Sequence, residues 1–73
     1  MAKVTIYSSD FCPYCSRAKA LLQARGVTDY EEIVVDGKPD VRARMTQITG
    51  RTSVPQIFIG EAHIGGCDDL HAL

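Results

Sequence analysis

Two cysteines lie three positions apart in the stretch Cys12-Pro13-Tyr14-Cys15, and their surroundings predict the local fold. An apolar run rich in β-branched residues, 4–7, precedes them, and a helical pattern, 17–22, follows them. Cys12 therefore falls in a turn between a strand and a helix, at the helix N-cap. Pro13 falls at the first helical position, where its fixed φ suits a helix and its missing N–H costs no hydrogen bond.

This position of the two thiols predicts their chemistry. The free N–H groups of the first helical turn and the positive end of the helix dipole point towards the Cys12 sulfur and favour its thiolate. The thiolate is the nucleophilic form of cysteine. Cys15 lies one turn further on, within reach of a mixed disulfide formed at Cys12. A C-x-x-C pair near a βαβ pattern is typical of thiol–disulfide redox sites.

Length and composition limit the classes of function. Seventy-three residues indicate a single domain, 1–73, near the lower size limit for one hydrophobic core. Eight basic and nine acidic residues give a net charge of −1 without a basic run, which argues against nucleic acid as a partner. No stretch predicts a signal peptide or a membrane span, so we expect no membrane partner and a cytoplasmic location. An odd count of three cysteines argues against a secreted disulfide scaffold.

The pattern of apolar residues and turn signals predicts the order β-α-β-α-β-β-α. The expected strands are 3–8, 30–35, 55–59 and 62–64, and the expected helices are 13–25, 39–49 and a short one from 67. A right-handed crossover makes the first two strands parallel, and the short connection makes the last two a hairpin. In the second helix Val41, Met45 and Ile48 form one apolar stripe. The fold class is therefore α/β, with a four-stranded mixed sheet flanked by helices.

Three motifs together resemble those of one family. They are Cys12-Pro13-Tyr14-Cys15, Thr52-Ser53-Val54-Pro55 and Gly65-Gly66-Cys67-Asp68-Asp69-Leu70, in this order. Over nearly its whole length the chain resembles the glutaredoxins, in particular the small bacterial dithiol members. The resemblance implies a monomeric thioredoxin-fold enzyme that uses glutathione to reduce protein disulfides and glutathione mixed disulfides. It also implies a cis peptide bond before Pro55, beside Cys12.

The same resemblance implies roles for individual residues. Cys12 would be the nucleophile and Cys15 the resolving thiol. The implied glutathione-binding residues are Tyr14, Arg42, Ser53, Val54, Pro55, Gly66, Cys67 and Asp68. The backbone of Val54 would pair with the cysteinyl part of glutathione, as one strand pairs with another.

The two ends of glutathione would meet different groups. At the start of the last helix, backbone N–H groups at Cys67 and Asp68 would bind the γ-glutamyl carboxylate, and the Asp68 side chain would bind its ammonium. Arg42 on the second helix would pair with the glycyl carboxylate, for which a guanidinium is well shaped.

Two features depart from the family pattern. Many members carry Lys a few residues before the first cysteine, whereas this chain has Ser9, so one cation near the thiolate is missing. Members also continue further after the last motif. Leu70 and Leu73 leave barely one apolar turn, which predicts a shortened C-terminal helix.

A zinc site is one alternative for the cysteines. It would combine Cys12, Cys15 and Cys67 with His63 or His71. Structural zinc sites usually bring together two close pairs of ligands, and this chain has only one. We therefore expect no metal.

Two further alternatives stay open. A thioredoxin-fold dimer could hold an iron–sulfur cluster with glutathione as a ligand, although Pro13 makes the loop stiffer than in members that do so. A thioredoxin would use a different reductant, and that family usually has Trp before its first cysteine and Gly-Pro between the pair. This chain has Phe11 and Pro-Tyr at these positions.

Other residues are predicted to take no part in the redox chemistry. Cys67 is expected to be a small buried residue without a redox role. The remaining ones are expected on the surface: His63, His71, Arg44 and Arg51.

Overall fold

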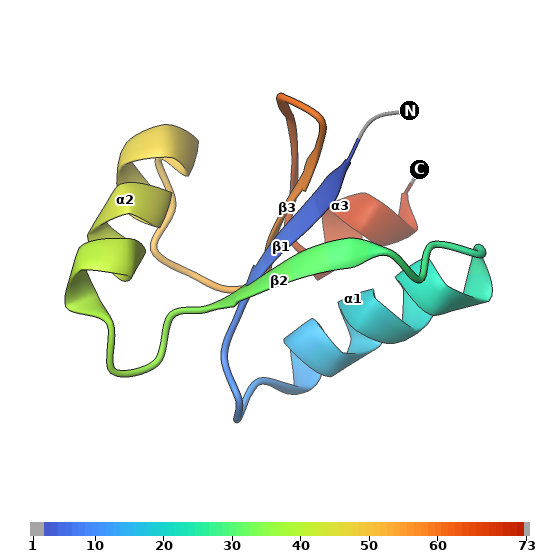
Figure 1. The fold of residues 1–73 in the computed structure, drawn as a ribbon, viewed down its shortest axis with the longest axis horizontal. Helices are drawn as coiled ribbons and strands as arrows, with labels where there is room; N and C mark the ends of the chain where they lie inside the picture. Colours follow the sequence, from blue (N-terminus) through green and yellow to red (C-terminus); the bar gives the residue numbers. More distant parts are fainter. Residues whose placement is uncertain (1–2, 73) are drawn as a thin grey trace.

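The computed structural model, which describes residues 3–72, follows the predicted order of elements (Figure 1). The elements are β1 (Val4–Ser8), α1 (Pro13–Ala24), β2 (Tyr30–Val34), α2 (Pro39–Thr49), β3 (Gln56–Ile59), β4 (Ala62–Gly65) and α3 (Cys67–His71). Each boundary lies within a residue of its prediction. Leu73, on which the expectation of a short final helix partly rested, lies outside the described residues.

The four strands form one mixed sheet in the order β2-β1-β3-β4. β1 pairs in parallel with β2 and antiparallel with β3, and β3 pairs antiparallel with β4. The predicted parallel pair and hairpin are therefore both confirmed. A register shift in the hairpin pairs Ile57 with Gly65 but Phe58 with His63, so β4 carries one extra residue there.

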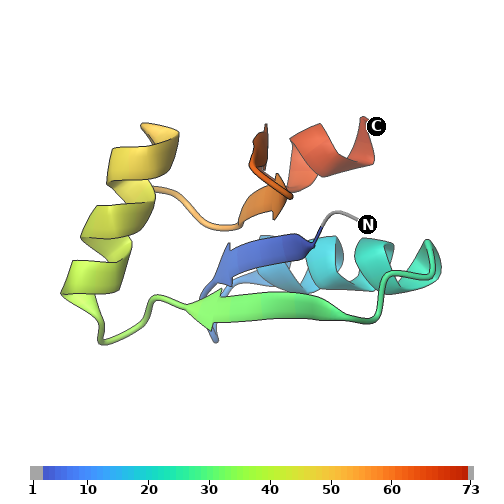
Figure 2. The same cartoon turned by 45° about the horizontal axis from the view of Figure 1, so that its top comes forward.

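The helices cover both faces of the sheet, with α2 on the opposite side from α1 and α3 (Figure 1, Figure 2). Alternation along β1 explains this, because Ile6 packs against α1 and α3 while Tyr7 packs against α2. The core on the first face consists of Val4, Ile6, Ala18, Leu22, Ile57, Cys67 and Leu70. The smaller core on the second face centres on Tyr7, Val35 and Met45.

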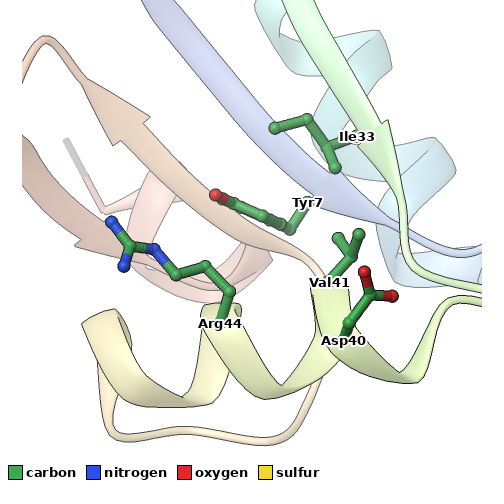
Figure 3. Close-up of a pocket in the computed structure, with 5 residues that line it drawn as sticks. All are labelled: Tyr7, Ile33, Asp40, Val41 and Arg44. Carbon is green, nitrogen blue, oxygen red and sulfur yellow. The ribbon is translucent and has the colours of Figure 1, made fainter.

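Helix α2 is only partly buried against its face of the sheet. Met45 is fully buried and Val41 packs beside it, as the predicted stripe requires. Ile48, the third member of that stripe, is 40% exposed, so the prediction is wrong there. An open groove of about 320 Å³ remains between helix and sheet, lined by Tyr7, Ile33, Asp40, Val41 and Arg44 (Figure 3).

Attachment of α2 should therefore depend on Met45. We expect Met45→Ala to lower the free energy of unfolding by about 2–5 kcal/mol, because it removes a fully buried side chain and leaves a cavity. Ile48→Ala on the same helix should cost no more than about 1 kcal/mol, because Ile48 is already partly in water. Urea unfolding of both variants measures the difference. Equal losses would mean that burial at Met45 does not hold α2 in place.

Candidate active site

The three sequence motifs meet at one cleft of about 270 Å³. The cleft is lined by Tyr14, Arg51, Ser53, Val54, Pro55, Gly66, Cys67, Asp68 and Asp69. These residues come from the first turn of α1, from residues 51–55 and from the start of α3. All the residues expected to bind glutathione line this cleft except Arg42.

Cys12 is the N-cap of α1, and Pro13 occupies the first helical position, as predicted. The Cys12 Sγ accepts a hydrogen bond from the Cys15 N–H at 3.2 Å. Its thiol donates to the Val54 carbonyl at 3.7 Å. The Val54–Pro55 peptide bond is cis, as the family resemblance implied. The half-buried sulfur thus lies between the helix start and the proline loop, residues 52–55.

Cys15 has a different environment from Cys12. Its side chain is fully buried. Burial and a hydrogen bond with Cys12 raise the pKa of the Cys15 thiol to about 12, against the effects of the Ser9 backbone and the Lys19 charge. Cys15 is therefore a protonated, sheltered thiol in the reduced protein, and a partner from solution meets Cys12 first.

Cys67 is also buried, with 5% of its surface exposed. Burial, and then the neighbouring Asp68 charge, raise the pKa of its thiol. It packs in the core between α1, α3 and the sheet and borders the cleft. The prediction of a small buried residue is confirmed.

The two acidic residues at the start of α3, Asp68 and Asp69, have different roles. Asp69 turns back to cap the helix, since its Oδ2 accepts the Gly66 N–H at 2.9 Å. Gly65 permits this, because its φ is +122° and a Cβ there would lie 2.7 Å from the Asp69 Cγ. Asp68 is exposed and lines the cleft.

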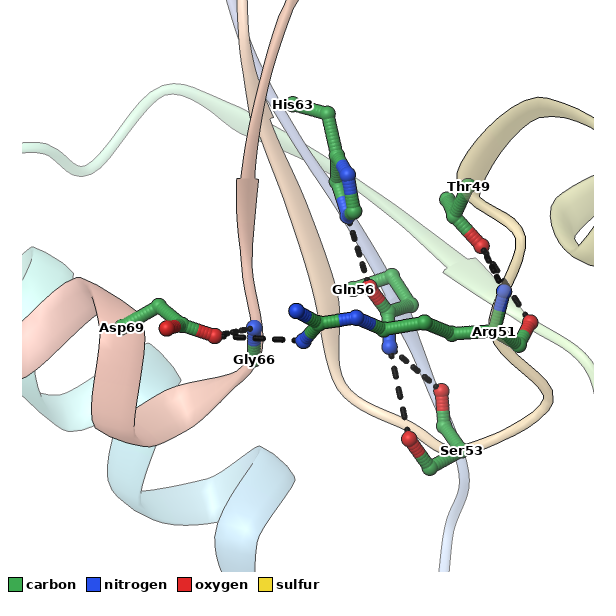
Figure 4. Close-up of polar contacts among 7 residues, drawn as sticks. All are labelled: Thr49, Arg51, Ser53, Gln56, His63, Gly66 and Asp69. Carbon is green, nitrogen blue, oxygen red and sulfur yellow. Dashed lines mark hydrogen bonds and ion pairs between the residues drawn. The ribbon is translucent and has the colours of Figure 1, made fainter.

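Arg51 joins the proline loop to α3. Its Nη1 lies 3.2 Å from the Asp69 Oδ2, and its side chain extends from the loop across to the helix (Figure 4). The Gly66 N–H and then Arg51 lower the pKa of Asp69. Arg51 is exposed, as predicted, but it also lines the cleft, which the sequence analysis missed. Its position directly before the proline motif was the available signal.

A buried glutamine at the start of β3 braces the proline loop (Figure 4). The Gln56 Nε2 donates to the Ser53 carbonyl at 2.9 Å, and its Oε1 lies 2.7 Å from the His63 Nε2. Because a carbonyl only accepts, the amide nitrogen faces Ser53 and the amide oxygen faces His63. His63 therefore carries a proton on Nε2. His63 is half-buried rather than exposed, so its prediction as a surface residue is wrong.

Arg42 lies outside the cleft lining. Its Nη1 donates to the Thr52 carbonyl at 3.0 Å and so supports the proline loop from the α2 side. Its contact with a glycyl carboxylate stays a prediction.

Ser9, at the position where many members carry Lys, is held by a carboxylate. Its hydroxyl donates to the two Asp36 oxygens at 2.7 and 2.8 Å, and the Asp10 N–H also donates to Asp36. These hydrogen bonds lower the pKa of Asp36. The segment that leads to Cys12 is thus tied to the β2–α2 connection without a cation at position 9.

Comparison with known proteins agrees with this geometry. The glutaredoxin family profile matches residues 4–64. The chain belongs to the glutaredoxin family. It is 60% identical to a glutaredoxin of Pseudomonas aeruginosa and 56% identical to glutaredoxin 3 of Escherichia coli K12, covering all of this chain and 86% and 87% of those proteins.

Solved glutaredoxins have the same fold. The solution structure of glutaredoxin from Brucella melitensis superposes with a TM-score of 0.82 at 53% identity, covering all of this chain and 78% of that one. A buckwheat glutaredoxin–glutathione complex superposes with a TM-score of 0.86 at 38% identity, covering 97% of this chain and 66% of that one. The predicted thioredoxin fold is confirmed, and the protein is a thiol–disulfide oxidoreductase.

Two kinds of feature are absent from the described residues, 3–72. No group of three or more His, Cys, Asp or Glu side chains is placed to hold a metal ion. No helix in this range is long and apolar enough to cross a membrane.

The contrast between the three thiols predicts selective alkylation. When the reduced protein is treated with iodoacetamide at neutral pH, we expect Cys12 to react first. Cys15 and Cys67 should react at least about tenfold more slowly, because they are buried and their raised pKa values leave little thiolate. Peptide mass spectrometry over time identifies the labelled residues. Labelling of Cys15 as fast as Cys12 would contradict the sheltered position of Cys15.

Proposed function

We propose that this glutaredoxin uses glutathione to reduce protein disulfides and glutathione mixed disulfides through the Cys12/Cys15 pair. The observation that carries the proposal is the half-exposed Cys12 sulfur, hydrogen-bonded by the Cys15 N–H at a helix start and placed beside the cleft. The buckwheat relative in complex with glutathione supports the choice of reductant. A reducing compartment, the cytoplasm, suits this chemistry.

The reaction proceeds by thiol–disulfide exchange. The Cys12 thiolate attacks one sulfur of the substrate disulfide, and the other sulfur leaves as a thiolate and takes up a proton. Cys15 then attacks the Cys12 sulfur, which releases the substrate thiol and leaves a Cys12–Cys15 disulfide. One glutathione thiolate reopens this disulfide to form a mixed disulfide at Cys12. A second glutathione attacks the bound glutathione sulfur, and glutathione disulfide leaves.

The cleft offers contacts for the cysteinyl and γ-glutamyl units of glutathione. The backbone of Val54 borders the cleft next to the Cys12 sulfur, where an extended cysteinyl unit can pair with it. At the other end, the exposed Asp68 carboxylate can bind the γ-glutamyl ammonium, and Arg51 adds a cation for the carboxylate of the same unit. Tyr14, in the first turn of α1, lines the side of the cleft that lies next to this helix.

The source of electrons tests the proposal directly. The protein is assayed for reduction of a protein disulfide with NADPH and either glutathione plus glutathione reductase or thioredoxin reductase alone. We expect turnover with the glutathione system and at most a few per cent of that rate with thioredoxin reductase. The opposite preference would replace glutathione with a thioredoxin-type reductant.

The two thiols should divide the reaction between them. Cys12→Ser should abolish all activity, because it removes the nucleophile. Cys15→Ser should keep reduction of glutathione mixed disulfides, which needs one protein thiol, but should lose most of the reduction of protein disulfides. Both variants are assayed with both substrates. Mixed-disulfide activity that survives in Cys12→Ser would reverse the assignment.

Asp68 provides a test of the binding mode. We expect Asp68→Ala to raise the KM for glutathione about tenfold with little change in kcat, because it removes a charge-assisted hydrogen bond to the ammonium. Glu61→Ala is the matched control, since Glu61 is an exposed acid in the β3–β4 turn away from the cleft. An unchanged KM in Asp68→Ala would reduce Asp68 to a helix-start residue.

A further inference from the structure

Three polar side chains form a cluster on the α1 face of the sheet, apart from the cleft. Ser8 on β1 is fully buried, and its hydroxyl donates to the Glu32 Oε2 on β2 at 2.6 Å. The Lys19 Nζ on α1 lies 2.8 Å from the same oxygen. The Lys19 and Glu32 side chains are only 28% and 33% exposed. This ion pair therefore links α1 to the sheet at a partly desolvated position.

Both partners of the ion pair are charged near neutral pH. Lys19 and then Ser8 lower the pKa of Glu32, and the hydrogen bond with Glu32 raises the pKa of Lys19. Neither group can therefore accept a proton from a nearby thiol in this range. The pair acts as a fixed arrangement of charges.

Lys19, the cation of this pair, also lies one helical turn from Cys15 along α1. Lys19 follows Cys15 by four residues on α1, so the two side chains share one face of the helix, one turn apart. The Lys19 charge lowers the pKa of Cys15, and Cys15 in turn raises that of Lys19. Lys19 and the Ser9 backbone favour the Cys15 thiolate, whereas burial and Cys12 oppose it. Glu32, itself held by Ser8, fixes the position of the Lys19 cation, and its negative charge only partly offsets the effect of that cation.

We propose that Lys19, anchored by Glu32 and Ser8, is a positioning residue for the resolving step, where its charge stabilises the thiolate that forms at Cys15. The proposal rests on the proposed dithiol function. In that step the Cys15 thiol gives up its proton to water and its sulfur attacks the Cys12 sulfur. The bond between Cys12 and the substrate sulfur breaks, the Cys12–Cys15 disulfide forms, and the substrate leaves as a thiolate that takes up a proton from water.

The contribution of Lys19 should be largest in the mixed disulfide. In the reduced protein Cys12 opposes ionisation of Cys15 through a hydrogen bond and through its charge. Both effects end once the Cys12 sulfur is bonded to a substrate. Burial of Cys15 then remains as the main opposing effect, and Lys19 and the Ser9 backbone remain to offset it.

The two steps can be observed separately with a coloured disulfide. One equivalent of 5,5′-dithiobis(2-nitrobenzoate) is mixed with reduced protein in a stopped-flow instrument. Attack by Cys12 releases the first coloured thiolate, and attack by Cys15 on the adduct releases the second. We expect Lys19→Met to slow the second release about fivefold and to move its pH profile to higher pH, with the first release unchanged, because a charge one helical turn from the sulfur is lost.

Matched variants separate charge from structure. Lys19→Arg keeps the cation and should restore most of the second rate. Lys3→Met removes the exposed Lys3–Glu31 ion pair between β1 and β2, and should change neither phase. Lys19→Gln replaces Lys19→Met if circular dichroism shows that the methionine variant is unfolded.

The outcomes distinguish this proposal from the one on which it rests. If Cys15→Ser still releases the second thiolate at the wild-type rate, the dithiol function itself fails. If the second release depends on Cys15 but Lys19→Met leaves its rate and pH profile unchanged, the role of Lys19 is overturned and the dithiol function stands. If Lys19→Arg and Lys19→Met slow the second release equally, the charge of Lys19 is not the cause, and the proposal is also overturned.

Discussion

The hydrogen bond from the Cys15 N–H to the Cys12 sulfur is the contact on which the site depends. It exists because Cys12 ends the loop after β1 and caps α1, so a sulfur takes the place that a serine or aspartate oxygen usually holds. One of the free N–H groups at the start of α1, that of Cys15, therefore donates its hydrogen bond to the Cys12 sulfur. The same helix turn directs Cys15 inward, where it is fully buried. One local structure thus creates two thiols with opposite exposures.

The second constraint is the shape of the proline loop, which lies outside the hydrogen-bonded strands of the sheet. Side chains on three sides hold this segment in place instead. Gln56 binds Ser53 from the sheet, Arg42 binds Thr52 from α2, and Arg51 extends from the loop to Asp69 on α3. The Cys12 thiol donates to the Val54 carbonyl of this loop. The contacts that hold the loop therefore also fix the position of this carbonyl beside the Cys12 sulfur.

Local signals in the sequence were sufficient for the fold and for the position of Cys12, because strands, turns and a helix start depend on neighbouring residues. Ile48 has the spacing of the apolar stripe but is 40% exposed, because spacing along a helix does not show how much of its face a neighbouring element covers. The cis bond before Pro55 came from the family resemblance alone. The roles of Gln56, His63 and Arg51 were missed because they depend on contacts between elements, such as Gln56 with His63 on β4 and Arg51 with Asp69 on α3. The local sequence pattern does not show which elements meet.

Burial of Cys15 creates a conflict that the rest of the fold must resolve. A sheltered thiol is protected from partners in solution, but the same burial raises its pKa to about 12 and opposes the thiolate needed for attack. The conflict eases in two ways on this chain. Once the Cys12 sulfur is bonded to a substrate, Cys12 no longer opposes ionisation of Cys15. In our proposal the Lys19 cation, held in place by Glu32, then favours the Cys15 thiolate. In the proposed dithiol reaction, the reactivity of Cys15 therefore depends on the state of Cys12, and the second thiol becomes a nucleophile only after the first has reacted with a substrate.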